Sequence, residues 1–246
     1  MLSALTDGVW YDTDASHFLG LKLTATMTVL RVGDGLLLHS PLPMTAERRA
    51  AVETLGRVTH LYAPNTFHHQ WLGEWIQAFP SATVHGPHEL ADKRPDLRID
   101  RFHDRDSAAD FGGVVTEIPI HGFRLRETAL VYRPGRTAVV TDLVHNIGRP
   151  THWWTKLYTR TMGFYDRVSM SRVLRWSAFD DKDAARHSVD ALLDQQFDAL
   201  IVGHGTPIPS LGREALATAT AWLPATSPRL TAKTPRAARF TPKPCG

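Results

Sequence analysis

The sequence predicts a layered α/β protein in which helices cover β-sheets. Each half of the chain begins with strand-like segments and continues into strand–loop–helix units, the arrangement typical of such folds. The 246 residues are 43% hydrophobic and 22% charged, as in ordinary globular proteins, and the chain is long enough to bury a large core. Composition gives no boundary between folding units before residue 224. We therefore expect one domain over residues 1–223.

The first half is predicted to begin with β structure. Residues 21–32 alternate apolar and polar side chains, as a half-buried strand does, and the Gly-Asp-Gly turn at 33–35 leads back into a short buried strand. Thr45 is a good N-cap for a helix that Gly56 ends. The expected elements are strands over 21–32, 36–40, 58–62 and 82–85, and helices over 46–55, 69–79 and 88–94.

The second half is predicted to open with three closely spaced strands, of which the last two are joined by a turn at Pro134 and Gly135. Residues 147–176 are expected to be helical but irregular, and Asp181 begins an amphipathic helix. The expected elements are strands over 114–120, 128–133, 137–142 and 199–202, and helices over 181–197 and 211–222.

The net charge of +3 arises from two basic segments. Residues 224–246 carry five Lys or Arg, five prolines and no acid, which predicts a disordered basic tail. Residues 147–176 carry six Lys or Arg against one acid, Asp166, and the rest of the chain is acidic. The positive charge is therefore local, and we expect no specific nucleic-acid binding.

Several other classes lack a motif in this sequence. Neither a glycine-rich dinucleotide-binding motif, nor a phosphate-binding loop, nor a Gly-x-Ser-x-Gly elbow is present. The only cysteine, Cys245, adjoins the C-terminus, so a disulfide framework is not expected. The chain lacks both a secretory signal pattern and the ~18 consecutive apolar residues of a membrane span. We expect a cytoplasmic protein.

Metal-competent side chains follow four predicted strands. Ligands gather beyond the carboxyl ends of strands in open α/β folds, and imidazole and carboxylate groups suit Zn²⁺, Fe²⁺ or Mn²⁺. Each residue also has a plain structural interpretation as an exposed histidine or a turn cap. His204 is the best placed, because the glycines on both sides let the backbone approach closely. The candidates are His68, His69, His121, Asp142 and His204.

The order of these segments along the chain, from the opening strands through the histidines and Asp142 to the Gly-His-Gly sequence, resembles the metallo-β-lactamase fold superfamily over residues 8–222. The resemblance implies a four-layer αββα sandwich. The first motif of that superfamily is His-x-His-x-Asp-His. Aligned on its last histidine, this chain has Pro64 and Thr66 in place of the first two histidines, His68 in place of the aspartate, and His69 as the final histidine.

The later motifs are better matched. VVTDLV resembles the segment of the bridging aspartate and implies Asp142, and IVGHG resembles that of the last histidine and implies His204. IPIHGF corresponds to the Gly-His-Thr segment and implies His121, with Arg124 and Glu127 as alternatives. The chain is similar to an uncharacterised bacterial subgroup with a degenerate first motif.

The resemblance implies one divalent metal ion, Zn²⁺ first and Fe²⁺ or Mn²⁺ as alternatives, held by His68, His69, Asp142 and His204. His68 is either a fourth ligand or a neighbour of the site that takes part in catalysis, and His121 completes the site or orients the substrate's oxyanion. We therefore expect a metal-dependent hydrolase with a mononuclear site, acting on a small-molecule anionic ester.

The alternative is a non-catalytic protein of the same fold that binds an anionic ligand or partner through residues 147–176, whose aromatic and basic side chains alternate. Peripheral contact of this segment with anionic lipid headgroups is a further interpretation. The oligomeric state is not specified by the sequence.

Overall fold

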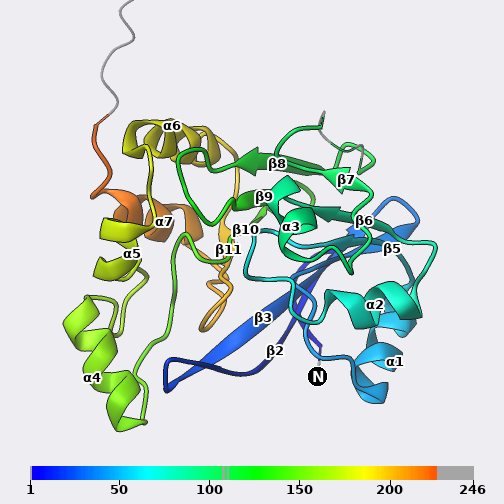
Figure 1. The fold of residues 1–246 in the computed structure, drawn as a ribbon, viewed down its shortest axis with the longest axis horizontal. Coiled ribbons are helices and arrows are strands. Elements are labelled where there is room, and N and C mark those ends of the chain that lie inside the picture. The colour runs from blue at the N-terminus through cyan, green and yellow to red at the C-terminus, as the bar shows by residue number, and fades with distance from the viewer. Residues whose placement is uncertain (1, 107–108, 110, 226–246) are drawn as a thin grey trace, which may run out of the picture.

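The computed structural model describes residues 2–106, 109 and 111–225. Two β-sheets pack face to face, and helices cover their outer sides (Figure 1). The predicted layered α/β arrangement is confirmed. The predicted basic tail lies, from residue 226 onward, outside the described residues. Within the described residues, no helix combines the length and the apolar character needed to cross a bilayer.

The first sheet has seven strands in chain order. Its first four strands pair antiparallel, and the remaining strands pair parallel. The strands are β1 (Ser3–Thr6), β2 (Val9–Phe18), β3 (Leu21–Val32), β4 (Gly35–His39), β5 (Arg57–Tyr62), β6 (Thr83–Gly86) and β7 (Arg101–Phe102). Three helices, α1 (Ala46–Leu55), α2 (Leu72–Ala78) and α3 (His88–Lys93), pack on its outer face.

The second sheet has four strands in the order β11 (Ala199–Ile201), β10 (Thr137–Val139), β9 (Thr128–Tyr132) and β8 (Val115–Pro119). Its outer face is covered by α6 (Lys182–Leu193) and α7 (Gly212–Thr220). Two further helices, α4 (Trp153–Met162) and α5 (Arg172–Ser177), lie at one end of the molecule beside the turn between β2 and β3 (Figure 1).

The space between the sheets holds an apolar core and, beside it, a group of buried histidines. Tyr62 of β5 is fully buried and stacks on the rings of His39, His85 and His103. The Tyr62 hydroxyl donates to Glu117 Oε1 of β8 at 2.8 Å and so joins the two sheets. These imidazoles are packed like core residues, so they are shielded from water.

Most predicted elements are present with shifts of one or two residues at their ends. The helix over 46–55 and its Thr45 cap match the prediction, because these signals are local. Strand β2 was not predicted as a separate element, and neither were the short β1 and β7. The segment 147–176 divides into two helices, because Gly163 adopts a left-handed conformation that ends α4.

The helix expected over 181–197 ends at Leu193, and two further elements are shorter than predicted on the side of the candidate site. The helix expected over 69–79 begins only at Leu72, because the Asn65 side chain accepts the backbone N–H groups of Phe67 and His68 in a turn. The strand expected over 137–142 ends at Val139, because the N–H groups of Thr141 and Asp142 are directed to Glu127.

Candidate metal centre

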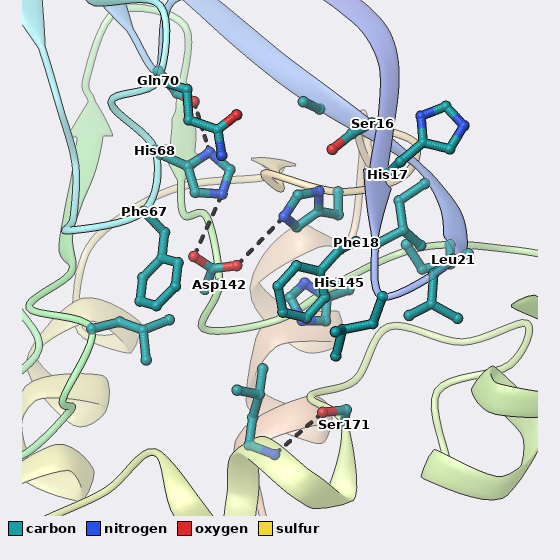
Figure 2. Close-up of a pocket in the computed structure, with 18 of the residues that line it drawn as sticks. Ser16, His17, Phe18, Leu21, Phe67, His68, Gln70, Asp142, His145 and Ser171 are labelled. Atoms are coloured by element: carbon teal, nitrogen blue, oxygen red, sulfur yellow. Dashed lines mark hydrogen bonds and ion pairs between the residues drawn. The ribbon is translucent and has the colours of Figure 1, made fainter.

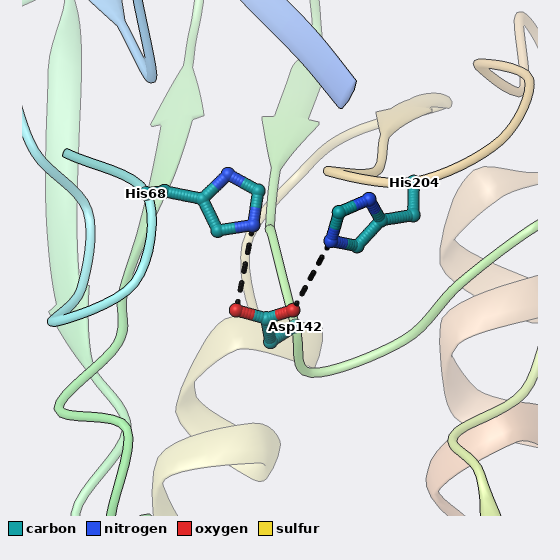
Figure 3. Close-up of side chains that lie close together, drawn as sticks. All are labelled: His68, Asp142 and His204. Atoms are coloured by element: carbon teal, nitrogen blue, oxygen red, sulfur yellow. Dashed lines mark ion pairs between the residues drawn. The ribbon is translucent and has the colours of Figure 1, made fainter. Parts of the chain in front are cut away.

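Three of the predicted site residues come together at the ends of three strands. His68 lies in the loop after β5, Asp142 follows β10, and His204 follows β11 (Figure 3). One donor atom from each lies within 4.8 Å of the others. The parallel pairing of β10 with β11 places Asp142 and His204 at the same edge of the second sheet, as expected for polar groups that follow neighbouring strands.

The distances inside this group suit a shared cation better than direct hydrogen bonds. His68 Nε2 lies 3.4 Å from Asp142 Oδ2, and His204 Nε2 lies 3.5 Å from Asp142 Oδ1. Hydrogen bonds between nitrogen and oxygen usually span about 2.7–3.2 Å. Two ligands that each bind Zn²⁺ at about 2.0–2.1 Å with tetrahedral angles lie about 3.3 Å apart. The three side chains are therefore candidate ligands for one small divalent ion.

Both imidazoles are held by their other nitrogen. His204 Nδ1 lies 2.7 Å from the carbonyl oxygen of Thr24, which can only accept, so this nitrogen carries the hydrogen. In the neutral ring, Nε2 is then left with a free lone pair. His68 Nδ1 lies 2.8 Å from Ser40 Oγ, which leaves its Nε2 facing Asp142. Such outer contacts fix the ring orientation of metal-binding histidines in proteins.

The Asp142 carboxylate is oriented by Asn65, a residue that is fully buried. Asn65 Nδ2 donates to Asp142 Oδ2 at 2.8 Å and to Thr141 Oγ1 at 3.0 Å. Its Oδ1 accepts from the backbone N–H groups of Phe67 and His68, both at 2.8 Å. One amide therefore positions both the carboxylate and the loop that carries His68.

Glu127 holds the other side of the Asp142 loop from within the protein. Its carboxylate accepts backbone N–H groups from Thr141 at 2.8 Å, Asp142 at 2.7 Å and Leu143 at 3.1 Å. Burial, together with the nearby Asp142 charge, raises the pKa of Glu127 to about 7 despite these hydrogen bonds. The alternative that Glu127 is the carboxylate facing the metal does not fit, because its oxygens are occupied by these three donors.

The glycines beside His204 allow its close packing. A Cβ at Gly203 would lie 2.9 Å from the Cα of Thr141 and 3.0 Å from the ring of His68. Gly205 has a φ of +105°, and a Cβ there would collide with the Asn146 carbonyl. The predicted reason for the Gly-His-Gly sequence, a close backbone approach, agrees with this geometry.

The structure does not bring His69 to the centre. Its Nδ1 lies 3.2 Å from the guanidinium of Arg94, on the side facing the α3 region. Burial and the charges of Lys93 and Arg94 lower the pKa of His69 to about 4. Of the two adjacent histidines, His68 rather than His69 therefore faces Asp142.

His121 is also away from the centre. It follows β8, the edge strand of the second sheet, which β9 separates from β10. His121 does not line the cavity over the centre but a second one beside His88, and it is not among the residues whose donor atoms lie together at Asp142. His121 is exposed, and its backbone N–H donates to Ser188 of α6. The alternative at this segment, Arg124, forms an ion pair with Asp180 at 2.5 Å.

A cavity of about 600 Å³ opens directly over the centre. In Figure 2, His68 and Asp142 stand at one wall, and Phe18 and Leu21 of the β2–β3 hairpin face them across the space. Most of the wall is apolar, and none of the described residues that line it is Lys or Arg. The cavity is large enough for an organic molecule rather than an ion alone.

His145 is a cavity residue that the sequence analysis missed. Its ring lies 5.5 Å from that of His204, and its buried Nδ1 has no hydrogen-bond partner in the structure. Burial and the neighbouring His204 lower the pKa of His145 to about 4, so the ring is neutral at pH 7. Its position three residues after Asp142 was the one available signal.

The Asp142 carboxylate and the imidazoles of the centre shift one another's pKa values toward the charged forms. Burial alone disfavours the Asp142 carboxylate, but His68 and His204 outweigh that effect and hold the pKa of Asp142 well below its usual range. Burial lowers the pKa of His204, but the Asp142 carboxylate raises it by more, so the pKa of His204 lies above its ordinary value. The centre therefore carries an ionised carboxylate facing two imidazoles, as a cation site requires.

Comparison with known proteins places the fold. No protein-family model and no curated protein sequence matches the chain. Among solved structures, a metallo-β-lactamase from Pontibacter korlensis has a TM-score of 0.62 at 12% identity, covering 91% of this chain and 98% of its own. The metallo-β-lactamase FIM-1 from Pseudomonas aeruginosa in its mono-zinc form also gives 0.62 at 12% identity, covering 90% and 94%.

A third similar structure is a fragment of a diflavin flavoprotein from Nostoc, with a TM-score of 0.60 at 15% identity, covering 90% of this chain and 93% of that one. These identities are low, and the likeness concerns the fold. The chain has the metallo-β-lactamase fold, a four-layer αββα sandwich, as the sequence resemblance predicted.

Proposed function

We propose that this metallo-β-lactamase-fold protein is a metal-dependent hydrolase with a mononuclear centre made of His68, Asp142 and His204. One observation carries the proposal. Both histidine Nε2 atoms face the same buried carboxylate at 3.4 and 3.5 Å, while both Nδ1 atoms have partners elsewhere. Zn²⁺ is the first candidate for the ion, and Fe²⁺ and Mn²⁺ are alternatives with the same donor preference.

The number of donors favours catalysis over a structural role. Structural zinc sites usually have four protein ligands, whereas catalytic sites have three and leave one position for water or substrate. With His69 turned toward Arg94, three ligands remain. A divalent cation held in this way lowers the pKa of water and polarises a carbonyl or phosphoryl oxygen.

The chain's own residues supply positioning and proton transfer. Asn65 and Glu127 fix the Asp142 loop, so the centre is preorganised before substrate enters. His145 lines the cavity beside His204, and its neutral ring can accept a hydrogen bond or a proton from a group reacting over the centre. We propose His145 as the acid–base residue. His121, expected to complete the site or orient the substrate's oxyanion, does not line this cavity.

The cavity suggests an apolar ester or amide as substrate. Its described lining lacks Lys and Arg, so apart from the proposed metal ion it offers an anionic group no positive side chain, which favours an uncharged substrate over the small anionic ester expected from the sequence. Two of the similar structures are named metallo-β-lactamases, which supports hydrolysis of an ester or amide bond. The basic side chains of residues 147–176 lie outside the cavity instead.

The first test is the metal content of the purified chain and of three variants. We expect about one zinc, iron or manganese ion per chain by elemental analysis, and its loss in His68→Ala and in His204→Ala. The matched control is His69→Ala, which alters the neighbouring histidine but keeps the metal. Metal loss in His69→Ala with retention in His68→Ala would contradict the assignment of the centre.

The second test is activity on p-nitrophenyl esters of increasing acyl length. We expect hydrolysis that chelator removes, that added metal restores, and that favours the longer apolar acyl groups. His145→Gln should lower kcat by about 100-fold while the metal content stays unchanged. A folded chain that binds no metal after incubation with Zn²⁺, Mn²⁺ or Fe²⁺ would support the non-catalytic alternative.

A further inference from the structure

Exposed apolar side chains are concentrated around the mouth of the cavity. Of the nine large hydrophobic residues that are exposed in the described chain, four line the cavity and four more lie on α4 and α5, the helices that contribute Tyr158 and Leu174 to its wall. Six of them form what we call the apolar rim: Phe18, Leu19, Trp153, Leu157, Val173 and Trp176. Trp176 is 84% exposed and Trp153 is 70% exposed, values that are unusual for indole side chains on a surface without a partner.

The apolar rim is one continuous face because the β2–β3 turn packs against α4. Trp154 Nε1 donates to the Leu19 carbonyl at 3.3 Å, and the Lys22 backbone N–H donates to Thr155 Oγ1 at 2.9 Å. Phe18, Leu19 and Val173 also line the cavity, so the rim leads directly into it. Figure 1 shows the hairpin reaching α4 at one end of the molecule.

Helix α4 presents two different sides. Thr155 and Thr159 are buried, whereas Trp153, Leu157 and the basic Lys156 are exposed. A helix whose large aromatic and aliphatic side chains face water, with its hydroxyl groups turned inward, has the reverse of the usual pattern for a globular protein. Its outer side is therefore suited to a partner that buries indole rings.

The charged side chains of α4 and α5 are all positive. Residues 147–176 have Asp166 as their only acid, and Asp166 is already paired with Arg149 at 2.6 Å. Lys22 and Lys156 are exposed beside the rim, and Arg160 and Arg172 are exposed on the same two helices. Tryptophan with Lys and Arg is the combination enriched where proteins meet the headgroups of a bilayer.

We propose that the apolar rim docks on an anionic lipid bilayer, with the cavity mouth facing the lipid. A second copy of this chain fits the surface less well, since a twofold contact would bring the same basic residues face to face. The indole and aliphatic side chains would enter the headgroup region while Lys and Arg contact lipid phosphates. The proposal does not depend on the hydrolytic role of the centre.

The test is co-sedimentation of the full-length chain with vesicles of phosphatidylcholine alone or mixed with phosphatidylglycerol. We expect binding to the anionic vesicles, with a blue shift of tryptophan emission. The Trp153→Ser/Trp176→Ser variant should bind about tenfold more weakly or worse. The matched control is Leu211→Asn, which removes an exposed apolar residue at the opposite end of β11 and suits its φ of 59°.

A charge variant separates the electrostatic contribution. Lys22→Glu/Lys156→Glu should lose binding to anionic vesicles, and added salt should weaken wild-type binding in the same direction. Every variant keeps residues 226–246, so any contribution of that basic segment is the same in all of them. Circular dichroism and thermal unfolding establish that each variant is folded.

Two results would overturn the proposal. The first is equal vesicle binding by the wild type and the Trp153→Ser/Trp176→Ser variant, which would assign the affinity to another part of the chain. The second is no vesicle binding by the wild type, together with a dimer in light scattering that this variant abolishes. That outcome would make the rim an interface between two copies.

Discussion

The described chain contains two groups of histidine and carboxylate side chains whose donor atoms lie within 4.8 Å of one another, and their surroundings differ. In the first, Asp142 contacts Asn65, His68 and His204. In the second, His88 Nδ1 lies 2.6 Å from Asp104 and 3.0 Å from Glu89, which gives a similar donor set at α3.

The two groups differ in the arginine side chains that contact them. Arg126 pairs with Glu89 at 2.7 Å, and the Arg105 guanidinium contacts His88 Nε2. Arg126 therefore balances one carboxylate of the second group and Arg105 occupies a nitrogen of its histidine, whereas the Asp142 carboxylate faces imidazoles and an amide. A donor set is thus insufficient to define a metal site, because neighbouring arginines compete with the ion for the same oxygens.

The largest expected effect separates the two groups by their carboxylates. Asp142→Asn removes the one formal charge that faces both imidazoles, and metal affinity should fall by at least about 100-fold. Asp104→Asn is the matched change in the second group and should leave metal content at the wild-type level. Elemental analysis and chelator competition measure both. Equal metal loss in the two variants would remove the distinction.

The next effect concerns the support beneath Asp142. Glu127→Gln replaces one of the two carboxylate oxygens by an NH₂ group, which cannot accept from the backbone N–H groups of Thr141 to Leu143. We expect metal affinity to fall by about 10–100-fold, as for other outer partners of metal ligands. Glu89→Gln is the control. Unchanged affinity in Glu127→Gln would mean that the loop holds its shape without this carboxylate.

Histidines without a facing carboxylate should make the protein sensitive to acid. Burial lowers the pKa of His39 and His85 to about 3 and that of His103 and His145 to about 4, against an ordinary value of 6.5. Between these values the unfolded chain binds protons that the folded chain does not. The free energy of unfolding should therefore be largest above pH 6.5 and should decrease as the pH drops toward 4.

Urea unfolding at several pH values measures this slope. His85→Phe removes one of the four groups from a site where His85 Nδ1 has no partner and Tyr62 and Phe111 pack nearby. Its unfolding free energy should depend less steeply on pH than that of the wild type. Stability that is flat between about pH 7 and pH 5 would show that the buried rings bind protons without cost.

The smallest effect is expected in the second group itself. His88 is partly exposed, and its contacts are surface ion pairs. His88→Ala should lower the free energy of unfolding by no more than about 1 kcal/mol. Metal content and esterase activity should not change. Loss of metal in this variant would instead point to a second ion-binding position.

The sequence predicted the parts of this molecule that depend on local signals. The Thr45-capped helix and the strand over 21–32 match the structure, and Asp142 and His204 were found because each follows a buried strand in the second sheet. The local sequence could not decide whether His68 or His69 faces the centre. Adjacent side chains point in different directions, and the turn that Asn65 forms decides which one faces Asp142.

The other errors arise from sheet order, which no short motif encodes. His121 ends a strand that runs in the same direction as β10, but β9 lies between the two. Asn65 acts through its amide, which is not a residue type that a search for metal ligands selects. Glu127 was considered only as an alternative carboxylate at the site, whereas its oxygens accept backbone N–H groups. His145 was overlooked because it lies in an irregular segment after the predicted strand.

The glycines on either side of His204 have a consequence for anyone who surveys sequences of this type. Gly203 leaves no room for a Cβ against Thr141, and Gly205 combines a left-handed conformation with contact to the Asn146 backbone. An exchange of either glycine would push the imidazole away from its partners. The tripeptide thus serves as a diagnostic: a chain that retains the fold but has lost one of these glycines should be counted among those without a working centre.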